Sequence, residues 1–496
     1  MSLANSTFTP NCTALLDSAA TLIPGLRPYV AQTYPAGSEF SLSNTTSFSD
    51  LSEFCRFGAH YNTSTNSQIQ FEAGNGGDLG SISYQEMSVP MTKYGFAMAS
   101  TNTGHNGSVA DGTFAMNNIE SQARSTLDGA QFTSAPFSRK QFGGKQGMRE
   151  VQGFPEDFDG ALTGAPAQWL SRQNGFNIYV GQLNMNETTP GEVVPTSFFP
   201  TWAQEVLAQC DEIDGVKDNV ILNPHLCTPD TSTVVCGASN ASAYVNSSTC
   251  ITEGQATTLA AVYKNWTSSA TGELLFPSYD PGSESGWTAL LSGTPFGLSS
   301  DFFLYQVYNY TTIQPALVVK NETELERITA IGDETDPGQG NAVNPDLTPF
   351  FQRGGKLMAY HGLADMNIPA GSSKHYYERV RTYYNESTDL RNYYRLFLVP
   401  GMGHCEGGNG ADGFGRPQQQ SGGRGDSLVY DADHDAVLAL MRWVENGTAP
   451  DQIISAKYVG NNKTEGVEFT RLLCPYPQEG KYISGDVNNS TSYVCE

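Results

Sequence analysis

The chain has 496 residues, of which 39% are hydrophobic and 11% aromatic, a composition typical of a packed globular protein and not of a disordered one. Its 51 acidic residues outnumber the 27 basic residues and give a formal net charge of −24 at pH 7. Because such a charge repels phosphate backbones and anionic lipid surfaces, we expect no nucleic acid and no membrane among its partners.

The amino-terminal part of the chain mixes short apolar runs with glycine-rich turns. The run Tyr94–Ser100 predicts a buried strand, and Phe158–Pro166 predicts a second strand that leaves through small residues. The stretch 168–345 is irregular and holds four of the nine cysteines. We therefore expect residues 168–345 to form a large inserted lid domain.

Apolar strands and amphipathic helices alternate again from about Phe350. Strands are predicted over 355–362 and 394–400, and helices over 374–384 and 433–445. Strands that alternate with helices favour a mainly parallel sheet. The predicted fold class is therefore α/β, with residues 1–167 and 346–496 forming the domain that holds the sheet.

Two features indicate a secreted protein in an oxidising compartment. Asn-x-Ser/Thr sequons are dense, about sixteen in all, and nine cysteines suggest a disulfide framework. The first residues have neither a basic nor an apolar segment, so we expect that a signal peptide was removed or that the start is misassigned. The expected location is extracellular.

Two polar loops directly follow the predicted strands of the second half. His361-Gly362-Leu363-Ala364-Asp365 follows the first strand, and Pro400-Gly401-Met402-Gly403-His404-Cys405 follows the second. Catalytic groups of such a sheet lie beyond the carboxyl ends of its strands, and an acid followed by a histidine is the order of hydrolase triads. A neutral imidazole can take the proton of a nucleophile while the carboxylate fixes its tautomer. Asp365 and His404 are therefore the candidate catalytic residues.

Structural roles remain as alternatives for Asp365 and His404. Asp365 could be a turn or helix-capping aspartate, and His404 could be a loop residue between glycines with no role. The remaining histidines are expected to be structural, with His105 as the one further candidate for a substrate pocket.

An acidic loop follows Cys210, in which Asp211, Asp214 and Asp218 surround Gly215. Carboxylates three and then four residues apart can turn their oxygens toward one point, as a hard cation such as Ca²⁺ prefers. The loop is not an EF-hand, because it lacks the glutamate at the twelfth position. The alternative is a solvated acidic loop that Cys210 and Cys227 would staple.

Motifs along most of the chain resemble the fungal tannase and feruloyl esterase family. The resemblance runs from about Phe71 to Asn446 and includes the acidic loop and both strand-end loops. Its further motifs are Gly74–Asp78, Ala99–His105, Gly143–Gly147, Phe154–Gly160 and Gly164–Ala167.

The resemblance implies an α/β-hydrolase fold with a large inserted lid domain and a Ser-Asp-His triad. On the family pattern Asp365 would be the orienting acid and His404 the base. The implied substrates are feruloyl or galloyl esters, as small molecules or in plant cell walls. The implied cofactor is a structural Ca²⁺ held by the side chains of Asp211, Asp214 and Asp218 and by the carbonyls of Val216 and Val220.

The chain departs from the family at the nucleophile. The family reads Gly-Cys-Ser-x-Gly-Gly there, and matching the glycines to Gly143-Gly144 places Lys140 at the cysteine and Gln141 at the serine. Glutamine has no nucleophilic oxygen of useful strength. The resemblance also implies a disulfide between the cysteine just before the serine and the cysteine just after the histidine, which is Cys405 here. Pairing neighbouring cysteines leaves Cys405 without that partner; the pairs are Cys12–Cys55, Cys210–Cys227, Cys236–Cys250 and Cys474–Cys495.

The segments around Gln70–Gly74 and Ser121–Pro136 are also shorter than in the family. We hypothesise that internal stretches are missing or misread, as a faulty exon boundary would produce. The competing hypothesis is a catalytically inactive relative that binds phenolic esters or plant glycans. Ser138 is a weak substitute nucleophile, because it lies three residues before the expected position.

Overall fold

The computed structural model describes residues 12–43, 46–48, 53–62, 68–73, 93–94, 100–101, 113, 116, 140–142, 144–186, 189, 191–319, 321–385, 389–416 and 423–496. Its helices are α1 (Leu15–Leu22), α4 (Gly144–Gly153), α5 (Leu170–Leu183), α6 (Phe199–Cys210), α7 (Glu253–Val262), α8 (Gly297–Asp301), α9 (Glu322–Thr335), α10 (Thr348–Gln352), α11 (Gly371–Tyr383) and α12 (Ala436–Asn446).

The strands belong to several sheets. They are β1 (Leu26–Tyr34), β2 (Phe40–Ser43), β3 (Thr46–Phe48), β4 (Phe54–Asn62), β5 (Gln68–Ala73), β6 (Ser100–Thr101), β7 (Lys140–Phe142), β8 (Gly160–Gly164), β9 (Trp266–Thr267), β10 (Leu274–Phe276), β11 (Lys356–Gly362), β12 (Tyr394–Val399), β13 (Ile453–Tyr458), β14 (Val467–Leu473), β15 (Gly480–Tyr482) and β16 (Tyr493–Cys495).

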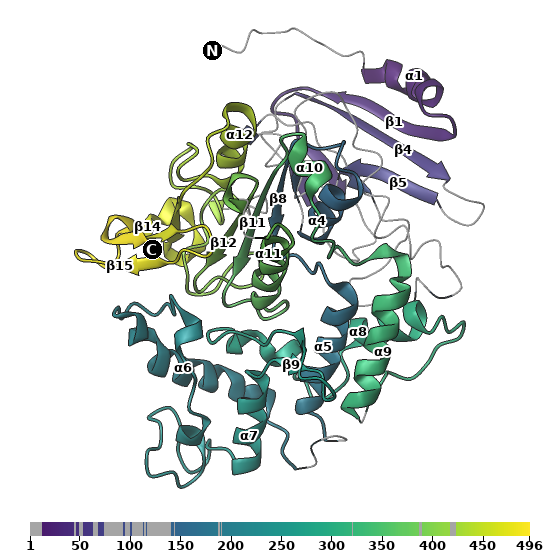
Figure 1. Ribbon diagram of the computed structural model, residues 1–496. Helices are drawn as coiled ribbons and strands as arrows, with labels where there is room; N and C mark the ends of the chain where they lie inside the picture. The colour runs from purple at the N-terminus through teal and green to yellow at the C-terminus, as the bar shows by residue number, and fades with distance from the viewer. Residues whose placement is uncertain are drawn as a thin grey trace.

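A four-stranded parallel sheet of order β12-β11-β8-β7 lies at the centre of the molecule (Figure 1). The strands predicted over 158–166, 355–362 and 394–400 are present as β8, β11 and β12, and the two predicted helices are present as α11 and α12. The predicted α/β class and parallel sheet are therefore confirmed.

Most of the strand predicted over 94–100 lies outside the described residues. Tyr94 lies in a helical turn, residues 95–99 lie outside the described residues, and Ser100 begins the short strand β6 of another sheet. The Tyr94 hydroxyl donates to the Asp435 carboxylate, which is 0% exposed.

Side chains of the central sheet alternate between two helical layers. Leu357 and Ala359 of β11 lie in a hydrophobic cluster with residues of α4, α10 and α11. Met358 and Tyr360 of the same strand lie in a second cluster with residues of α12. A parallel strand that is covered on both faces needs such a continuous apolar run. Burying each large aliphatic side chain contributes about 1.5–3 kcal/mol.

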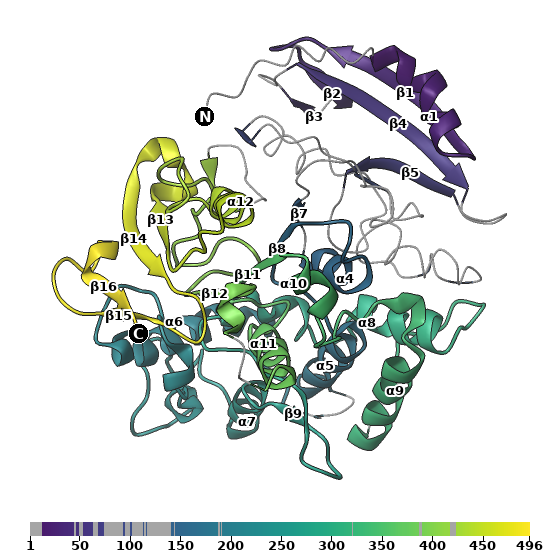
Figure 2. The ribbon, with the colours of Figure 1, turned by 45° about the horizontal axis from the view of Figure 1, so that its top comes forward.

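A separate antiparallel sheet of order β1-β4-β5-β6 lies at the amino-terminal side of the molecule (Figure 2). Helix α1 covers part of it, because Ala19 packs against Leu26 and Ala59. The pairs β13–β14 and β15–β16 form the carboxyl-terminal edge, drawn in yellow in Figure 1.

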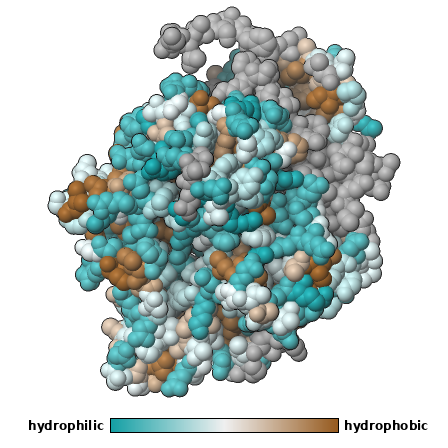
Figure 3. Space-filling model, viewed as in Figure 1, coloured by the Kyte–Doolittle hydropathy of each residue, from teal (hydrophilic) through white to brown (hydrophobic). Residues whose placement is uncertain are grey.

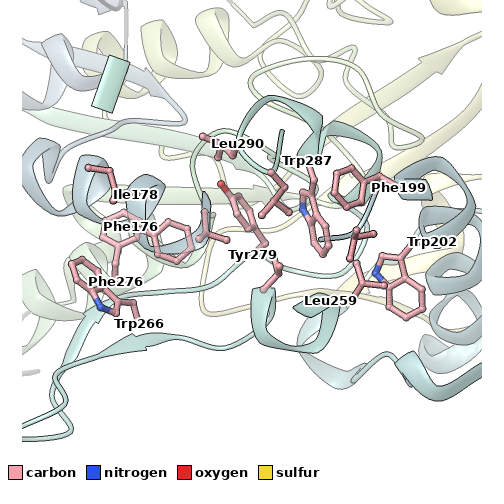
Figure 4. Close-up of a cluster of buried hydrophobic side chains, with 14 of the residues drawn as sticks. Phe176, Ile178, Phe199, Trp202, Leu259, Trp266, Phe276, Tyr279, Trp287 and Leu290 are labelled. Atoms are coloured by element: carbon pink, nitrogen blue, oxygen red, sulfur yellow. The ribbon is translucent and has the colours of Figure 1, made fainter. Parts of the chain in front are cut away.

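Residues 168–345, here called the insert, lie between β8 and β11 and carry α5 to α9. The insert has a hydrophobic cluster whose fully buried members all come from residues 176–328. Figure 4 shows Phe199, Trp202 and Trp287 in this cluster, and the rings of Phe199 and Trp287 meet edge to face at 6.0 Å. In Figure 1 the teal elements of the insert lie together on one side of the sheet.

All four predicted disulfides are present, and Cys405 is free and buried. The bridges close segments of 14 to 43 residues. Closing a loop of about 15 residues restricts the unfolded chain by on the order of 3 kcal/mol. The framework therefore stabilises the insert and both ends of the chain.

Among the described residues, no helix has the length and apolar character needed to cross a membrane. The face in Figure 3 is mainly hydrophilic, and its apolar patches are small and separate.

Candidate active site

The loop after β11 and the loop after β12 pack against each other through their backbones. The N–H of Ala364 donates a 2.9 Å hydrogen bond to the carbonyl oxygen of Met402. A Cβ on Gly362 would stand 2.2 Å from that oxygen and 2.3 Å from the carbonyl oxygen of Gly403. Glycine at position 362 is therefore required for the two loops to meet.

Asp365 and His404 meet at this junction. His404 Nδ1 lies 2.8 Å from Asp365 Oδ2, and the other oxygen, Oδ1, accepts hydrogen bonds from the N–H groups of Asn367 and Ile368 at 2.8 and 2.9 Å. Since an ionised carboxylate can only accept, Nδ1 carries the proton and Nε2 is left as the basic nitrogen. The carboxylate is 0% exposed and the imidazole 36% exposed. The pair thus has a buried acid and a reachable base.

The two groups shift each other's pKa in opposite directions. Burial alone would raise the pKa of Asp365, but the His404 and His361 rings outweigh burial and hold it well below its ordinary value. Burial alone would lower the pKa of His404, but Asp365, with a smaller effect of Glu406, raises it above 6.5. An imidazolium formed at His404 is therefore stabilised.

A second histidine contacts the same carboxylate, and sequence reasoning placed it among the structural residues. His361 Nε2 lies 3.2 Å from Asp365 Oδ2, and the residue is 0% exposed. Its spacing of four residues from Asp365 was the available signal, but that spacing has no fixed meaning at the end of a strand.

The insert packs directly on the loop that carries Asp365. A Cβ on Gly282 would contact Ala364 at 3.8 Å, and one on Gly286 would stand 2.2 Å from Met366. Burial, and then the charge of Asp365, raises the pKa of Tyr279 well above 10. The insert therefore forms one wall around the acid.

The strand that should lead to a nucleophile is present at the edge of the same sheet. Lys140–Phe142 form β7, which runs parallel to β8, and α4 begins at Gly144. A Cβ on Gly144 would stand 2.4 Å from the carbonyl oxygen of Gly164, so the helix start lies tightly against the exit of β8. The sequence from 140 to 144 contains no serine, threonine or cysteine. Two other candidates, His105 and Ser138, lie outside the described residues.

The acidic loop is held by hydrogen bonds within itself. Asp211 accepts from the N–H groups of Asp218 and Asn219 at 3.2 and 3.1 Å, and Asp214 accepts from those of Val216 and Leu222 at 2.9 and 3.1 Å. Gly215 has a φ of +89°, which the turn between the carboxylates requires. The predicted staple, Cys210–Cys227, brackets the loop.

The carboxylates of this loop also influence one another. Burial raises the pKa of Asp214 to about 6, and the nearby Asp218 and Asp211 act in the same direction. Asp218 accepts a hydrogen bond from the Val220 N–H at 3.0 Å and forms an ion pair with Arg471 of β14. An all-oxygen set of close, partly buried carboxylates fits a hard divalent cation in its chemistry. In the described part of the chain, however, no group of three or more His, Cys, Asp or Glu side chains is arranged to hold a metal ion.

Comparisons with known proteins point to one family. The family model of tannase and feruloyl esterase matches residues 61–295 and 306–496. A probable feruloyl esterase B-1 of Aspergillus oryzae is 32% identical over 500 residues, which cover 93% of this chain and 88% of that protein. A probable feruloyl esterase B-1 of Aspergillus terreus is 32% identical over 538 residues, with coverages of 99% and 96%.

Solved structures agree with these matches. Feruloyl esterase B from Aspergillus oryzae superimposes with a TM-score of 0.83 at 29% identity, covering 98% of this chain and 99% of that chain. Tannin acyl hydrolase from Aspergillus niger has a TM-score of 0.71 at 22% identity over 98% and 95% of the two chains, a likeness of fold alone.

One alignment is longer than the chain itself. The match with the Aspergillus terreus protein runs over 538 positions, whereas this chain has 496 residues. That relative therefore holds segments that this chain lacks.

Proposed function

The chain belongs to the tannase and feruloyl esterase family, and on that premise we propose that it is a serine-type carboxylic ester hydrolase of phenolic-acid esters whose nucleophile is lost from this sequence. The observation that carries the proposal is the 2.8 Å hydrogen bond between Asp365 and His404 at the ends of neighbouring parallel strands. The order of β7, then the acid after β11, then the base after β12 matches the Ser…Asp…His order of the α/β-hydrolase fold.

In a member with an intact nucleophile, the base equivalent to His404 would take the hydroxyl proton through Nε2 as the serine oxygen attacks the ester carbonyl. The carboxylate equivalent to Asp365 would hold Nδ1–H and stabilise the imidazolium, which would then give its proton to the leaving alcohol. Water would release the acid from the acyl-enzyme by the same steps.

Restoring the nucleophile tests this proposal. The double variant Lys140→Cys, Gln141→Ser places the family's pair at the end of β7 and gives Cys405 a candidate disulfide partner. We expect this variant to hydrolyse methyl ferulate or methyl gallate, and we expect His404→Ala in that background to abolish the activity. A folded double variant without His404-dependent hydrolysis would contradict the assignment of position 141.

The second candidate function is a catalytically inactive relative that binds phenolic esters or plant glycans. The absence of a hydroxyl or thiol between residues 140 and 144 favours it for the sequence as written. Calorimetry with methyl ferulate, methyl gallate and feruloylated oligosaccharides tests this second candidate function, which requires binding without turnover; a chain that binds none of these ligands would contradict it.

We further propose that the insert, residues 168–345, is the lid of the hydrolase and that residues 1–167 and 346–496 are its catalytic domain. The packing of Gly282 and Gly286 against the Asp365 loop supports a lid that shapes the site. The separate hydrophobic cluster of the insert supports its independence as a folding unit.

The acidic loop is the proposed site of a structural Ca²⁺. Asp211, Asp214 and Asp218 would supply carboxylate oxygens, and Val216 and Val220 would supply carbonyl oxygens. The ion would offset the mutual repulsion that helps to raise the pKa of Asp214. The four disulfides and the many sequons support secretion to an extracellular location, where plant cell-wall esters or small phenolic esters are the substrates.

A further inference from the structure

His361 contacts three polar groups, two in the loop after β11 and one in α11. Its Nδ1 lies 2.8 Å from the Ser373 hydroxyl of α11. Its Nε2 lies 2.9 Å from the carbonyl oxygen of Ile368 and 3.2 Å from Asp365 Oδ2. Since the residue is fully buried, water does not compete for these contacts.

These contacts determine which ring nitrogen carries the proton. A carbonyl and an ionised carboxylate can only accept, so the nitrogen facing Ile368 and Asp365 must donate. Nε2 therefore carries a proton. In the neutral ring Nδ1 then accepts a hydrogen bond from the Ser373 hydroxyl, which is free to rotate into the donating position.

The two oxygens of the Asp365 carboxylate therefore have different partners. Oδ1 is filled by the two backbone N–H groups of Asn367 and Ile368, and Oδ2 faces the two imidazoles. We propose that His361 is a positioning residue, whose Nε2–H shares Asp365 Oδ2 with His404, keeps that carboxylate ionised and lowers the proton affinity of the His404 ring.

The direction of the effect follows from charge. The Nε2–H of His361, which donates to the Ile368 carbonyl and lies 3.2 Å from Asp365 Oδ2, withdraws negative charge from the oxygen that faces His404. Without this donor, Oδ2 interacts with His404 alone and holds its proton more tightly. The backbone hydrogen bonds to Oδ1 would still hold the carboxylate in place, so the electrostatic change dominates.

The other charged groups around the two rings do not reverse this sign. Glu406 faces His404 and, like Asp365, raises the pKa of the His404 ring. Its effect is the same in every His361 variant, so it does not change the comparison between them. Asp280, on the insert, is the other acid near His361, and Lys374 and His225 lie close to it.

Two further titratable groups lie near Asp365. Burial raises the pKa of the Tyr279 hydroxyl and of the Cys405 thiol, so both stay neutral when the imidazoles titrate. The coupling of His361 to His404 is therefore carried by Asp365.

Nitrogen NMR of the ¹⁵N-histidine-labelled chain tests the inference through the proton affinity of His404. His361→Asn removes the donor at the Nε2 position, whereas His361→Gln can keep an N–H there. We expect His361→Asn to raise the proton affinity of His404 about threefold or more, and His361→Gln to keep it near that of the parent. His434→Asn, which changes a histidine bonded to Asp431 at 2.7 Å, is the matched control and leaves His404 unchanged.

The same spectra can overturn the inference even if His361→Asn does not fold. In the unaltered protein, His361 is expected to remain in the Nε2–H tautomer across the titration of His404. An Nδ1–H tautomer, or a His404 proton affinity that stays equal or falls in folded His361→Asn, overturns the inference. The catalytic meaning of the coupling rests on the proposed function, but the NMR result does not, so failure of the coupling and failure of esterase activity are distinguishable.

Discussion

The N–H of Ala364 donates to the carbonyl oxygen of Met402, so the two loops that carry Asp365 and His404 are joined by their backbones. This contact lies beside Gly362, where no side chain fits. The side-chain pair therefore depends on a close approach of two backbones that only glycine permits.

Replacing Gly362 by alanine is expected to destabilise the protein. The new Cβ would overlap two backbone carbonyls, which cannot move aside without separating the loops, and overpacking of this kind costs about 1–3 kcal/mol. Urea denaturation followed by fluorescence measures the change. Gly153→Ala is the control, because its Cβ would meet only the mobile end of Arg149 at 3.3 Å; equal losses in both variants would contradict the explanation.

Calcium is expected to stabilise the acidic loop most strongly at neutral and alkaline pH. The pKa of Asp214 is raised to about 6 in the folded metal-free chain. A carboxyl with a raised pKa contributes stability fully below its unfolded value of about 4 and loses that contribution as the pH rises through about 6. Because Ca²⁺ binds the ionised carboxylate, adding Ca²⁺ to the metal-free chain should raise the Tm more at pH 8 than at pH 5.

Two matched variants check the calcium prediction. Asp214→Asn removes a proposed ligand and should make the Tm insensitive to EGTA at pH 8. Glu212→Gln removes a charge of the same loop whose side chain is 67% exposed, and it should leave the EGTA effect intact. A parent protein whose Tm ignores EGTA at pH 8 would rule out the proposed ion.

The Asp365–His404 pair predicts a pH-dependent contribution to stability. The raised pKa of His404 means that its contribution is complete below about 6.5 and is lost as the pH rises through the folded value. The lowered pKa of Asp365 means that its contribution is present above about 4 and is lost in acid. The difference in denaturation midpoint between the parent and His404→Gln should be larger at pH 5.5 than at pH 9; a difference that is constant with pH would show that the pair is not coupled.

Truncating the core of the insert should be severe. Trp287 is 1% exposed and packs against Phe199 and Tyr263. We expect Trp287→Ala to cost about 3–5 kcal/mol, measured by urea denaturation. Leu226→Ala, at a side chain that is 52% exposed, is the control and should change stability by no more than about 0.5 kcal/mol. A similar, small change in both variants would mean that the insert has no folded core of its own.

Peptide mass spectrometry of the native secreted protein tests whether the elbow segment has been misread. We expect the native protein to hold a peptide with a cysteine and a serine before Gly143-Gly144. Detection of Ser138–Phe142 as written in this chain would refute that hypothesis and favour the inactive relative.

Much of the fold was predictable because it follows from local patterns. The continuous apolar runs of β11 and β12 predict strands that are covered on both faces, and the residues after them occupy the edge where catalytic groups gather. Pairing neighbouring cysteines was sufficient, because each bridge joins residues that are close in sequence or in adjacent elements.

What the sequence did not predict depends on contacts between distant segments. His361 looks like one more residue of a buried strand, and its role depends on Ser373 and Ile368, which the fold brings to it. The ion pair between Asp218 and Arg471 joins residues 253 positions apart, and no local pattern indicates it.

The most direct measurement is the rate at which the chain, as its sequence is written, hydrolyses methyl ferulate and methyl gallate beside its His404→Ala variant. We expect equal, background rates for the two proteins, because the acid and the base are in place and the attacking group is not. Hydrolysis by the parent chain that disappears in His404→Ala would contradict it, since a nucleophile would then exist where the sequence has none.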